Sequence, residues 1–224
     1  MNQLETYLLK WNISCIIFDL DGTLVNTLEQ HIKAFQILFK EINQEISYEA
    51  ISENMGRTPK DTLLSLIPIL ESNHEKLKKS ADRKERILTD LLNEIPVFEG
   101  TIEVLKYLKK TKKIICLASS TPRYNVVKIL KSAKIVHYFK YIVTGEDISI
   151  GKPNPEVFLK AAKKANKEPK ECLVIGDSTH DIIAARRANM KIIVVSTGKH
   201  NELELQTKSP NLIINSLKDL MKIK

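Results

Sequence analysis

The stretch "CIIFDLDGTLVNT", residues 15–27, decides the fold. A short apolar run leads directly into Asp19, a second carboxylate follows at Asp21, and Gly22 then interrupts the chain. Short runs that are apolar on both faces are typical of strands in a parallel sheet that helices cover on both sides. The sequence therefore predicts a buried strand that ends in two acidic side chains one residue apart.

Five further apolar runs rich in β-branched residues predict the other strands, at 113–119, 140–144, 172–176, 191–196 and 211–215. Amphipathic segments of helix length separate the later runs, at 122–133, 155–166 and 179–189. The repeated order of strand, helix and strand indicates an α/β fold with a doubly wound, Rossmann-like parallel sheet.

The first connection breaks this alternation. Residues 19–113 span far more chain than one crossover helix requires, and the segment 100–111 can serve as that helix. Most of the remainder has helical periodicity, for example at 31–42 and 58–70. We therefore predict a helical insertion that leaves the sheet after its first strand.

This insertion divides the chain into two predicted domains. Residues 1–25 and 96–224 would form the α/β core domain, and residues 26–95 an α-helical cap domain. Ligands of open parallel sheets bind beyond the carboxyl ends of the strands. Because the insertion leaves the first strand at that edge, we expect the cap to lie over the site as a lid.

The charge balance is basic, +8 over 224 residues, which raises the question of nucleic-acid binding. The lysines, however, occupy one face of amphipathic segments such as 104–113 and 158–171, and apolar residues fill the other face. Only 6% of the residues are aromatic, and they are not interleaved with basic residues as in a base-stacking surface. We expect no nucleic-acid partner.

The sequence also favours a cytoplasmic protein. No apolar run approaches the ~18 residues of a membrane span, so we expect no membrane partner. The N-terminal segment lacks the apolar core of a secretory signal. Cys15, Cys116 and Cys172 lie in predicted strands at a spacing that fits no metal site. Buried free thiols are typical of a reducing compartment. Nothing in the sequence specifies the oligomeric state.

The carboxylates suggest a metal site. Asp19 and Asp21 point to the same side of an extended chain, so they need a cation between them or a shared proton. Capping of a turn or helix is the alternative role. The strand at 172–176 ends in Asp177, with Asp181 close behind, and can neighbour the first strand. Carboxylates without His or Cys form a hard oxygen site, which favours Mg²⁺.

Two further loops carry candidate phosphate ligands. Ser119 and Ser120 stand at the end of a predicted strand, where their hydroxyls can donate to an anionic oxygen. A helix N-cap is the alternative role of Ser120 or of Thr121, which precede Pro122. The segment "GKPNP" places Lys152 between two prolines and a glycine, a framework that suits a defined position better than a solvent-facing one.

These residues form four motifs, "DLDGT", "CLAS", "GKPNP" and "GDSTHD", in this order at the ends of predicted strands. Together they resemble the motifs of the haloacid dehalogenase superfamily. The resemblance spans about residues 13–220 and is greatest to its capped phosphatase branch, which includes phosphoglycolate phosphatases and β-phosphoglucomutases. It implies a Rossmann-like core with an inserted helical cap, the layout that the segment lengths indicate on their own.

The resemblance also implies roles. Asp19 would be the nucleophile that forms an aspartyl-phosphate, and Asp21 the general acid and then the general base. Mg²⁺ would be held by Asp19, the backbone carbonyl of Asp21 and Asp177, with Asp181 in support. Lys152 would neutralise charge on the phosphoryl group and on Asp19. Phosphate ligands would be Gly22, Thr23, Ser119, Ser120 and Lys152. Asp21, without such neutralisation, would carry the proton.

Cap residues are expected to select the leaving group. Thr27 and His31 lie one helical turn apart and can face the same way; in the β-phosphoglucomutase branch a Thr and a His at these offsets contribute to the cap side of the site. Arg57 follows Gly56 in a loop that this family typically points at the site. Ordinary surface positions remain the alternative for His31 and Arg57, and Lys84 is a further candidate.

The fourth motif favours hydrolysis over isomerisation, because Gly176 stands where sugar-phosphate mutases of this type usually carry an acidic residue. We predict a Mg²⁺-dependent phosphatase, a phosphoric monoester hydrolase, that acts on a small phosphorylated metabolite, phosphoglycolate-like or a sugar phosphate, through an aspartyl-phosphate. A β-phosphoglucomutase-type phosphotransferase is the first alternative. A non-catalytic phosphate-responsive regulator is the second, although such a protein needs neither Asp21 nor a cap.

Overall fold

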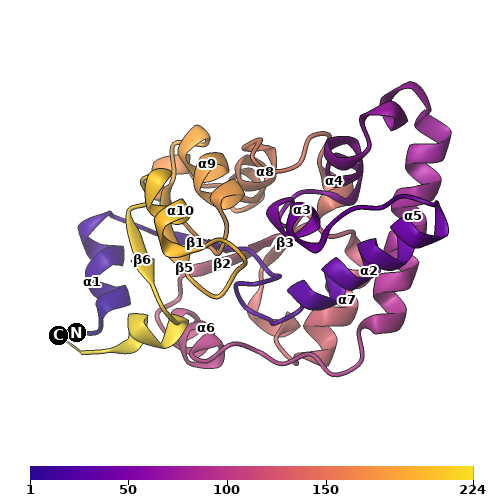
Figure 1. Ribbon diagram of the computed structural model, residues 1–224. Coiled ribbons are helices and arrows are strands. Elements are labelled where there is room, and N and C mark those ends of the chain that lie inside the picture. Colours follow the sequence, from indigo (N-terminus) through magenta and orange to yellow (C-terminus); the bar gives the residue numbers. More distant parts are fainter. Residues whose placement is uncertain (224) are drawn as a thin grey trace.

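The computed structural model describes residues 1–223 and has a six-stranded parallel sheet at its centre (Figure 1). The strand order is β3-β2-β1-β4-β5-β6, and each neighbouring pair is parallel. The predicted α/β class is confirmed, and all six expected strands are present close to their expected bounds. They are β1 (Cys15–Phe18), β2 (Ile114–Ala118), β3 (Tyr141–Val143), β4 (Cys172–Gly176), β5 (Lys191–Val195) and β6 (Leu212–Ile214).

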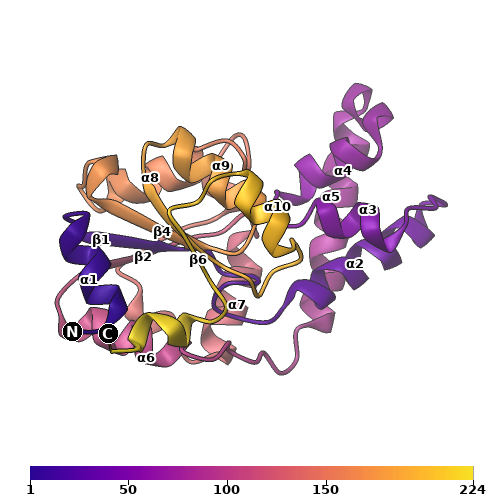
Figure 2. The ribbon, with the colours of Figure 1, turned by 60° about the vertical axis from the view of Figure 1, so that its left-hand side comes forward.

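Helices cover both faces of the sheet (Figure 2). One face packs against α1 (Gln3–Lys10), α6 (Thr101–Lys110) and α7 (Arg123–Ser132). The other packs against α8 (Glu156–Lys164), α9 (Thr179–Arg187) and α10 (Glu202–Thr207). Side chains alternate along a strand, so Ile16 and Phe18 of β1 are buried in the first layer and Cys15 and Ile17 in the second. This two-sided burial explains why the strands are apolar throughout.

The sheet brings the ends of three strands to one edge. β1 lies between β2 and β4, and Phe18 is in register with Leu117 on one side and Ile175 on the other. The residues that follow these strands therefore meet at the point where the direction of strand addition reverses, which is where α/β sheets bind ligands.

Residues 26–95 are helical wherever they are regular. The helices are α2 (Leu28–Glu41), α3 (Tyr48–Glu53), α4 (Pro59–Leu66) and α5 (His74–Leu91), with a 3₁₀ turn η1 (Pro68–Ser72). In both views they lie together to the right of the sheet, with α2 and α5 side by side (Figures 1 and 2). The division into a core and a cap domain stays a prediction, but the helical segment occupies the place expected of a cap.

The segment 58–70, expected as one helix, is divided. α4 ends at Leu66, and Ile67 leaves the helical region with φ −135° and ψ 74°. Pro68 explains the break, because proline has no N–H to donate and disfavours a helical conformation in the residue before it.

Both ends of the described chain lie beside each other. Asn2 caps the unanticipated helix α1 by accepting from the Glu5 N–H, and Gln3 donates its N–H to the carbonyl of Lys222. The remaining 3₁₀ turns are η2 (Val136–Tyr138), η3 (Gly145–Asp147), η4 (Pro169–Glu171) and η5 (Leu217–Met221). Among residues 1–223, no helix combines the length and the hydropathy needed to span a membrane.

Candidate active site

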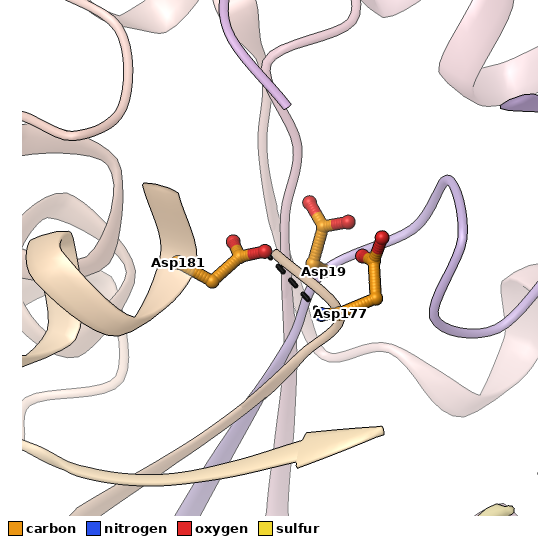
Figure 3. Close-up of side chains that lie close together, drawn as sticks. All are labelled: Asp19, Asp177 and Asp181. Carbon is orange, nitrogen blue, oxygen red and sulfur yellow. Dashed lines mark hydrogen bonds between the residues drawn. The ribbon is translucent and has the colours of Figure 1, made fainter. Parts of the chain in front are cut away.

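Three buried carboxylates meet at the carboxyl edge of the sheet (Figure 3). Asp19 follows β1, Asp177 follows β4, and Asp181 lies in the first turn of α9. One oxygen from each lies within 4.8 Å of the others. The expected proximity of these three residues is therefore observed, and it follows from the pairing of β1 with β4.

Lys152 compensates part of this charge. Its Nζ donates to Asp19 Oδ1 at 2.6 Å and to Asp181 Oδ1 at 2.8 Å, and the side chain is fully buried. Burial alone lowers the pKa of Lys152, but the carboxylates of Asp181 and Asp19 raise it above its usual value. Burial alone raises the pKa of Asp181, yet Lys152 and the Ser178 hydroxyl hold it below its usual value.

The other two carboxylates are under-compensated. Burial raises the pKa of Asp19 to about 7 despite Lys152, with Asp181 and Asp21 adding to the shift. Burial and the charge of Asp181 also raise the pKa of Asp177 well above its usual value. A dense group of buried oxygen donors with too little positive charge fits a hard divalent cation. The residues present therefore match the metal site that the fold implies.

Gly22 and Thr23 position Asp177. Gly22 has φ +87°, and a Cβ at this position would lie 2.4 Å from Asp177 Oδ2. The hydroxyl of Thr23 donates to Asp177 Oδ1 at 2.8 Å. The turn after β1 thus requires glycine both for its backbone conformation and for the close approach of this carboxylate. A phosphate-binding role for these two residues stays a prediction.

Asp21 is surrounded differently from the expectation. The Thr27 hydroxyl donates a hydrogen bond to Asp21 Oδ1 at 2.5 Å, and the Thr121 hydroxyl donates one to Oδ2 at 2.9 Å. His31 Nε2 lies 3.2 Å from Oδ1. Burial alone raises the pKa of Asp21, but these contacts hold it below its usual value. Within residues 1–223 no lysine or arginine pairs with Asp21, but these three contacts stabilise its anionic form, which the sequence did not predict.

Lys84 extends this network. Its Nζ lies 3.1 Å from His31 Nδ1 and 2.8 Å from Glu85 Oε1, and it is buried. An ammonium can only donate, so the bonding pattern assigns the proton-bearing nitrogen of His31 to Nε2, which then donates to Asp21. Asn125 of α7 in turn donates to Glu85 Oε2 at 2.6 Å. Buried contacts therefore run from Asp21 through the helical segment and back to the sheet domain.

The serine loop and the Arg57 loop touch each other. Ser119 Oγ accepts from the Thr121 N–H at 3.1 Å, and Ser120 Oγ donates to the Gly56 carbonyl at 2.7 Å. Arg57, the next residue, donates from Nε to His180 Nε2 at 3.0 Å. Neither serine caps α7, whose N-cap position is Pro122.

A small cavity of about 30 Å³ lies between these loops. Its lining includes most of the predicted catalytic and substrate residues: Asp19, Asp21, His31, Arg57, Lys84, Ser119, Ser120 and Lys152. A larger cleft of about 1070 Å³ adjoins it, with Pro59, Glu85 and Ser120 in both linings. Five predicted site residues lie outside this lining. Thr27 donates to Asp21 and Asp181 accepts from Lys152, both of which line the cavity, whereas Gly22 and Thr23 contact Asp177.

Sequence reasoning missed Thr121, Glu85, Asn125 and His180. Thr121 was weighed only as a helix cap, and Glu85 and Asn125 look like ordinary helix residues because their contact spans 40 positions of the chain. For His180 a signal existed. It stands inside the "GDSTHD" motif, directly before Asp181 and one helical turn after Asp177.

Comparison with known proteins gives a consistent result. The family model described as haloacid dehalogenase-like hydrolase matches residues 16–195. A curated relative from Bacillus anthracis, "Pyrophosphatase PpaX", is 31% identical, and the match covers 94% of this chain and 96% of the relative.

Solved structures agree with this family. A hydrolase from Pseudomonas syringae superposes with a TM-score of 0.86 at 30% identity, over 92% of this chain and 95% of the other. A β-phosphoglucomutase from Clostridium difficile superposes with a TM-score of 0.83 at 26% identity, over 93% of each chain.

Proposed function

The chain belongs to the haloacid dehalogenase-like hydrolases, with phosphatase or phosphotransferase activity, and from this premise we propose a Mg²⁺-dependent phosphatase that works through an aspartyl-phosphate on Asp19. The observation that carries the proposal is the surroundings of Asp19. This buried carboxylate at the cavity wall is bonded to Lys152 and lies within reach of the oxygens of Asp177 and Asp181.

In the first half-reaction a carboxylate oxygen of Asp19 attacks phosphorus, and the bond to the leaving oxygen breaks. Asp21, from its place in the same cavity wall, gives that oxygen a proton. In the second half-reaction Asp21 takes a proton from water, the resulting hydroxide attacks phosphorus, and Asp19 leaves as a carboxylate. Lys152 stabilises the anionic form of Asp19 at the start and the end of this cycle.

Asp19, Asp177 and the backbone carbonyl of Asp21 would hold Mg²⁺, with Asp181 in support. When bound, the metal supplies positive charge opposite the phosphoryl oxygens. Ser119 would donate to those oxygens, and the backbone N–H groups near Gly22 and Thr23 would contribute to the same cradle. Ser120 would join them only by giving up the bond that its hydroxyl donates to the Gly56 carbonyl. Ser119 is suited to this role because its hydroxyl oxygen accepts from Thr121, which leaves its own proton free to donate.

We place the leaving group under the helical segment 26–95, which acts in this proposal as the cap domain. Thr27, His31 and Arg57 are its contributions to substrate choice. Small phosphorylated metabolites remain the substrate class, and inorganic pyrophosphate joins phosphoglycolate-like and sugar phosphates as a candidate. Its support is the name of the curated relatives, "Pyrophosphatase PpaX", and two cationic side chains in the cavity wall, Arg57 and Lys84.

The structure offers a reason to favour a phosphatase over a mutase. A Cβ at Gly176 would lie 2.6 Å from Asp181 Cγ, so Asp181 occupies the space that a side chain at position 176 would need. An acidic residue at Gly176, the usual choice in sugar-phosphate mutases of this type, is therefore incompatible with the present position of Asp181. We also assign the protein to the cytoplasm, where its three buried free cysteines stay reduced.

The test is phosphate release in the presence of Mg²⁺ from pyrophosphate, phosphoglycolate, sugar phosphates and p-nitrophenyl phosphate. We expect turnover of at least one substrate, with Asp19→Asn inactive as the control. If no phosphate were released from any of these substrates, the proposal would be contradicted. Conversion of β-glucose 1-phosphate to its 6-phosphate isomer, with stimulation by a bisphosphate, would favour the mutase instead.

A further inference from the structure

Arg57, in the cavity wall, contacts His180 in a way that the mechanism above does not use. Arg57 lies in the loop between α3 and α4, and His180 lies in the first turn of α9, next to Asp181. The guanidinium Nε donates to His180 Nε2 at 3.0 Å. His180 is buried, with only 7% of the residue's surface exposed.

The geometry specifies the state of His180. A guanidinium can only donate hydrogen bonds, so the imidazole nitrogen that faces it must be an unprotonated acceptor. The other nitrogen, Nδ1, is buried and has no hydrogen-bond partner within residues 1–223. Unpaired buried polar atoms are rare and destabilising. The only polar contact of this side chain in the described structure is therefore the one with Arg57.

A neutral acceptor has a consequence for charge. The two other cations in the cavity wall each have a carboxylate partner: Lys152 pairs with Asp19 and Asp181, and Lys84 pairs with Glu85. Arg57 has no carboxylate partner in the part of the chain that the structure describes. An imidazole orients the guanidinium without cancelling its charge, whereas an Asp or Glu would do both.

The loop that carries Arg57 is also held in place on either side of this contact. The Gly56 carbonyl accepts from Ser120 Oγ, and a Cβ at Gly56 would lie 3.1 Å from Ser178 Oγ. Asp61, at the start of α4, accepts from the Gly151 N–H at 3.0 Å, next to Lys152. These contacts fix the backbone of the loop against the core. The hydrogen bond to His180 then orients the Arg57 side chain.

We propose that His180 is a positioning residue that holds Arg57 at the cavity with its charge uncompensated, so that the guanidinium binds an anionic group on the leaving-group side of the substrate. The proposal rests on the proposed function and narrows its substrates to those whose leaving group is itself anionic. Pyrophosphate and phosphoglycolate belong to this class. Phosphates of simple sugars do not, because the sugar that leaves carries no charge of its own.

Three substitutions separate orientation from charge. His180→Gln keeps an acceptor oxygen, His180→Leu removes the acceptor at similar volume, and His180→Glu keeps an acceptor but neutralises Arg57. The readout is the ratio of kcat/KM for pyrophosphate to that for p-nitrophenyl phosphate, whose leaving group carries no charge in the bound substrate. His180→Leu and His180→Glu should lower this ratio about tenfold or more, mainly through KM, because a charge-assisted hydrogen bond is weakened. His180→Gln should keep the ratio close to that of the wild type.

Two controls identify a merely structural effect. His200→Leu changes the neighbouring imidazole, whose ring centre is 5.8 Å away, and should leave the ratio unchanged. The effects of Arg57→Gln and His180→Leu on the ratio should be non-additive in the double variant, because both act through one contact. An equal loss for both substrates, a His180→Gln variant as poor as His180→Leu, or full additivity would overturn the proposal.

A binding measurement covers the case in which the wild-type protein turns over neither substrate, which would count against the proposed function alone. Imidodiphosphate, a pyrophosphate analogue that resists hydrolysis, is titrated calorimetrically into the wild type and each variant with Mg²⁺ present. Weaker binding by His180→Leu and His180→Glu, but not by His180→Gln, would support the positioning role. Equal affinity in all four proteins would overturn it.

Discussion

Two carboxylates one residue apart in the chain have opposite electrostatic surroundings. Burial raises the pKa of Asp19 to about 7, and the compensation from Lys152 is incomplete. Asp21 is also buried, yet His31, Thr27 and Thr121 hold its pKa below the usual value. The anionic form of Asp19 therefore depends on further positive charge, whereas that of Asp21 depends on hydrogen bonds from the helical segment and from Thr121. Without a cation or substrate this order is the reverse of what a nucleophile and a proton donor need. The proposed division of labour therefore requires a cation beside Asp19, which lowers its pKa, and an anionic substrate beside Asp21, which raises its pKa.

The division predicts different defects. Asp19→Asn should abolish turnover and phospho-enzyme formation, because the amide is not a nucleophile. Asp21→Asn should slow the hydrolysis of phosphate esters with alkoxide leaving groups by about 10²–10⁴-fold, the usual contribution of a general acid or base. With p-nitrophenyl phosphate, whose leaving group needs little protonation, Asp21→Asn should still form a phospho-enzyme that hydrolyses slowly. Intact-protein mass spectrometry after rapid quenching checks this. A phosphorylated Asp19→Asn protein would contradict the assignment of the nucleophile.

Gly22 gives a second prediction at this scale. In Gly22→Ala the new methyl group would fall 2.4 Å from Asp177 Oδ2, at a backbone φ of +87° that alanine adopts only with strain. We expect about a 100-fold loss of kcat, the typical effect of displacing a site group by about 1 Å. Steady-state kinetics on folded protein measures it. Gly100→Ala is the matched control.

Gly100 also has φ +87°, and its Cβ would meet the backbone N of Lys218 at 2.0 Å, far from the carboxylates. The control should lower the free energy of unfolding while leaving kcat per folded molecule unchanged. If both variants lose stability and neither loses kcat, Gly22 has no role in placing Asp177.

At the scale of elements, the strands were predictable because each is apolar on both faces and short. Asp19, Asp177 and Ser119 could then be placed at one edge from strand ends alone. The partners of Asp21 could be predicted only in part. Thr27 and His31 follow from their spacing on one helix, whereas Thr121 lies 100 positions away from Asp21 and becomes a neighbour only through the fold. Contacts between distant helices, such as Glu85 with Asn125, leave no periodic signal in a single sequence.

The turn η3, which precedes the Lys152 loop, predicts a pH-dependent stability. The Thr144 N–H and hydroxyl donate to Asp147 Oδ2, and Arg123 pairs with the same oxygen. Partial burial raises the pKa of Asp147, but these contacts hold it below its usual value. A depressed folded pKa means that the stabilisation is present above the unfolded value of about 3.9 and disappears as pH falls through the folded value.

Asp147→Asn keeps an acceptor oxygen but removes the charge, so it should lower the free energy of unfolding by about 0.5 kcal/mol at pH 7, the usual contribution of a partly exposed charge pair. The difference from wild type should be complete above the unfolded pKa and should shrink to nothing as the pH falls through the lower folded pKa. Urea unfolding at a series of pH values checks it. The adjacent Glu146, whose carboxylate makes no hydrogen bond within residues 1–223, supplies the control Glu146→Gln. A difference that persists unchanged in acid would show that charge is not the cause.

At the scale of the whole molecule, the helical segment and the sheet domain share one polar framework. Asp21 contacts His31, Lys84 pairs with Glu85, and Glu85 accepts from Asn125. Arg57 and Asp61 add contacts to α9 and to the Lys152 loop. At about 30 Å³ the cavity between them is too small for a phosphorylated metabolite, so we expect the helical segment to move when substrate binds. Because the carboxylates of the site lie within this shared framework, metal binding to them should change the stability of the entire fold.

This coupling predicts the direction in which Mg²⁺ should change the stability of the protein. Without a cation, Asp19, Asp177 and Asp181 place three buried carboxylates within 4.8 Å of one another against one lysine, an arrangement that destabilises the folded state. Mg²⁺ at about 100 times its Kd should stabilise the protein by about 2.7 kcal/mol. For a chain of this size this corresponds to a rise of roughly 5–10 °C in Tm. EDTA should reverse the rise and abolish phosphatase activity.

Asp177→Asn should raise the Tm of the protein without metal and reduce the rise in Tm that Mg²⁺ causes. Removing one charge relieves the repulsion, so the variant without metal should have a higher Tm than the wild type without metal. The same substitution removes a ligand, so Mg²⁺ should raise its Tm far less. NaCl at equal ionic strength controls for screening, which acts mainly on exposed charges. If Mg²⁺ stabilised Asp177→Asn as much as the wild type, the cation would have to bind elsewhere, and these carboxylates would not be its ligands.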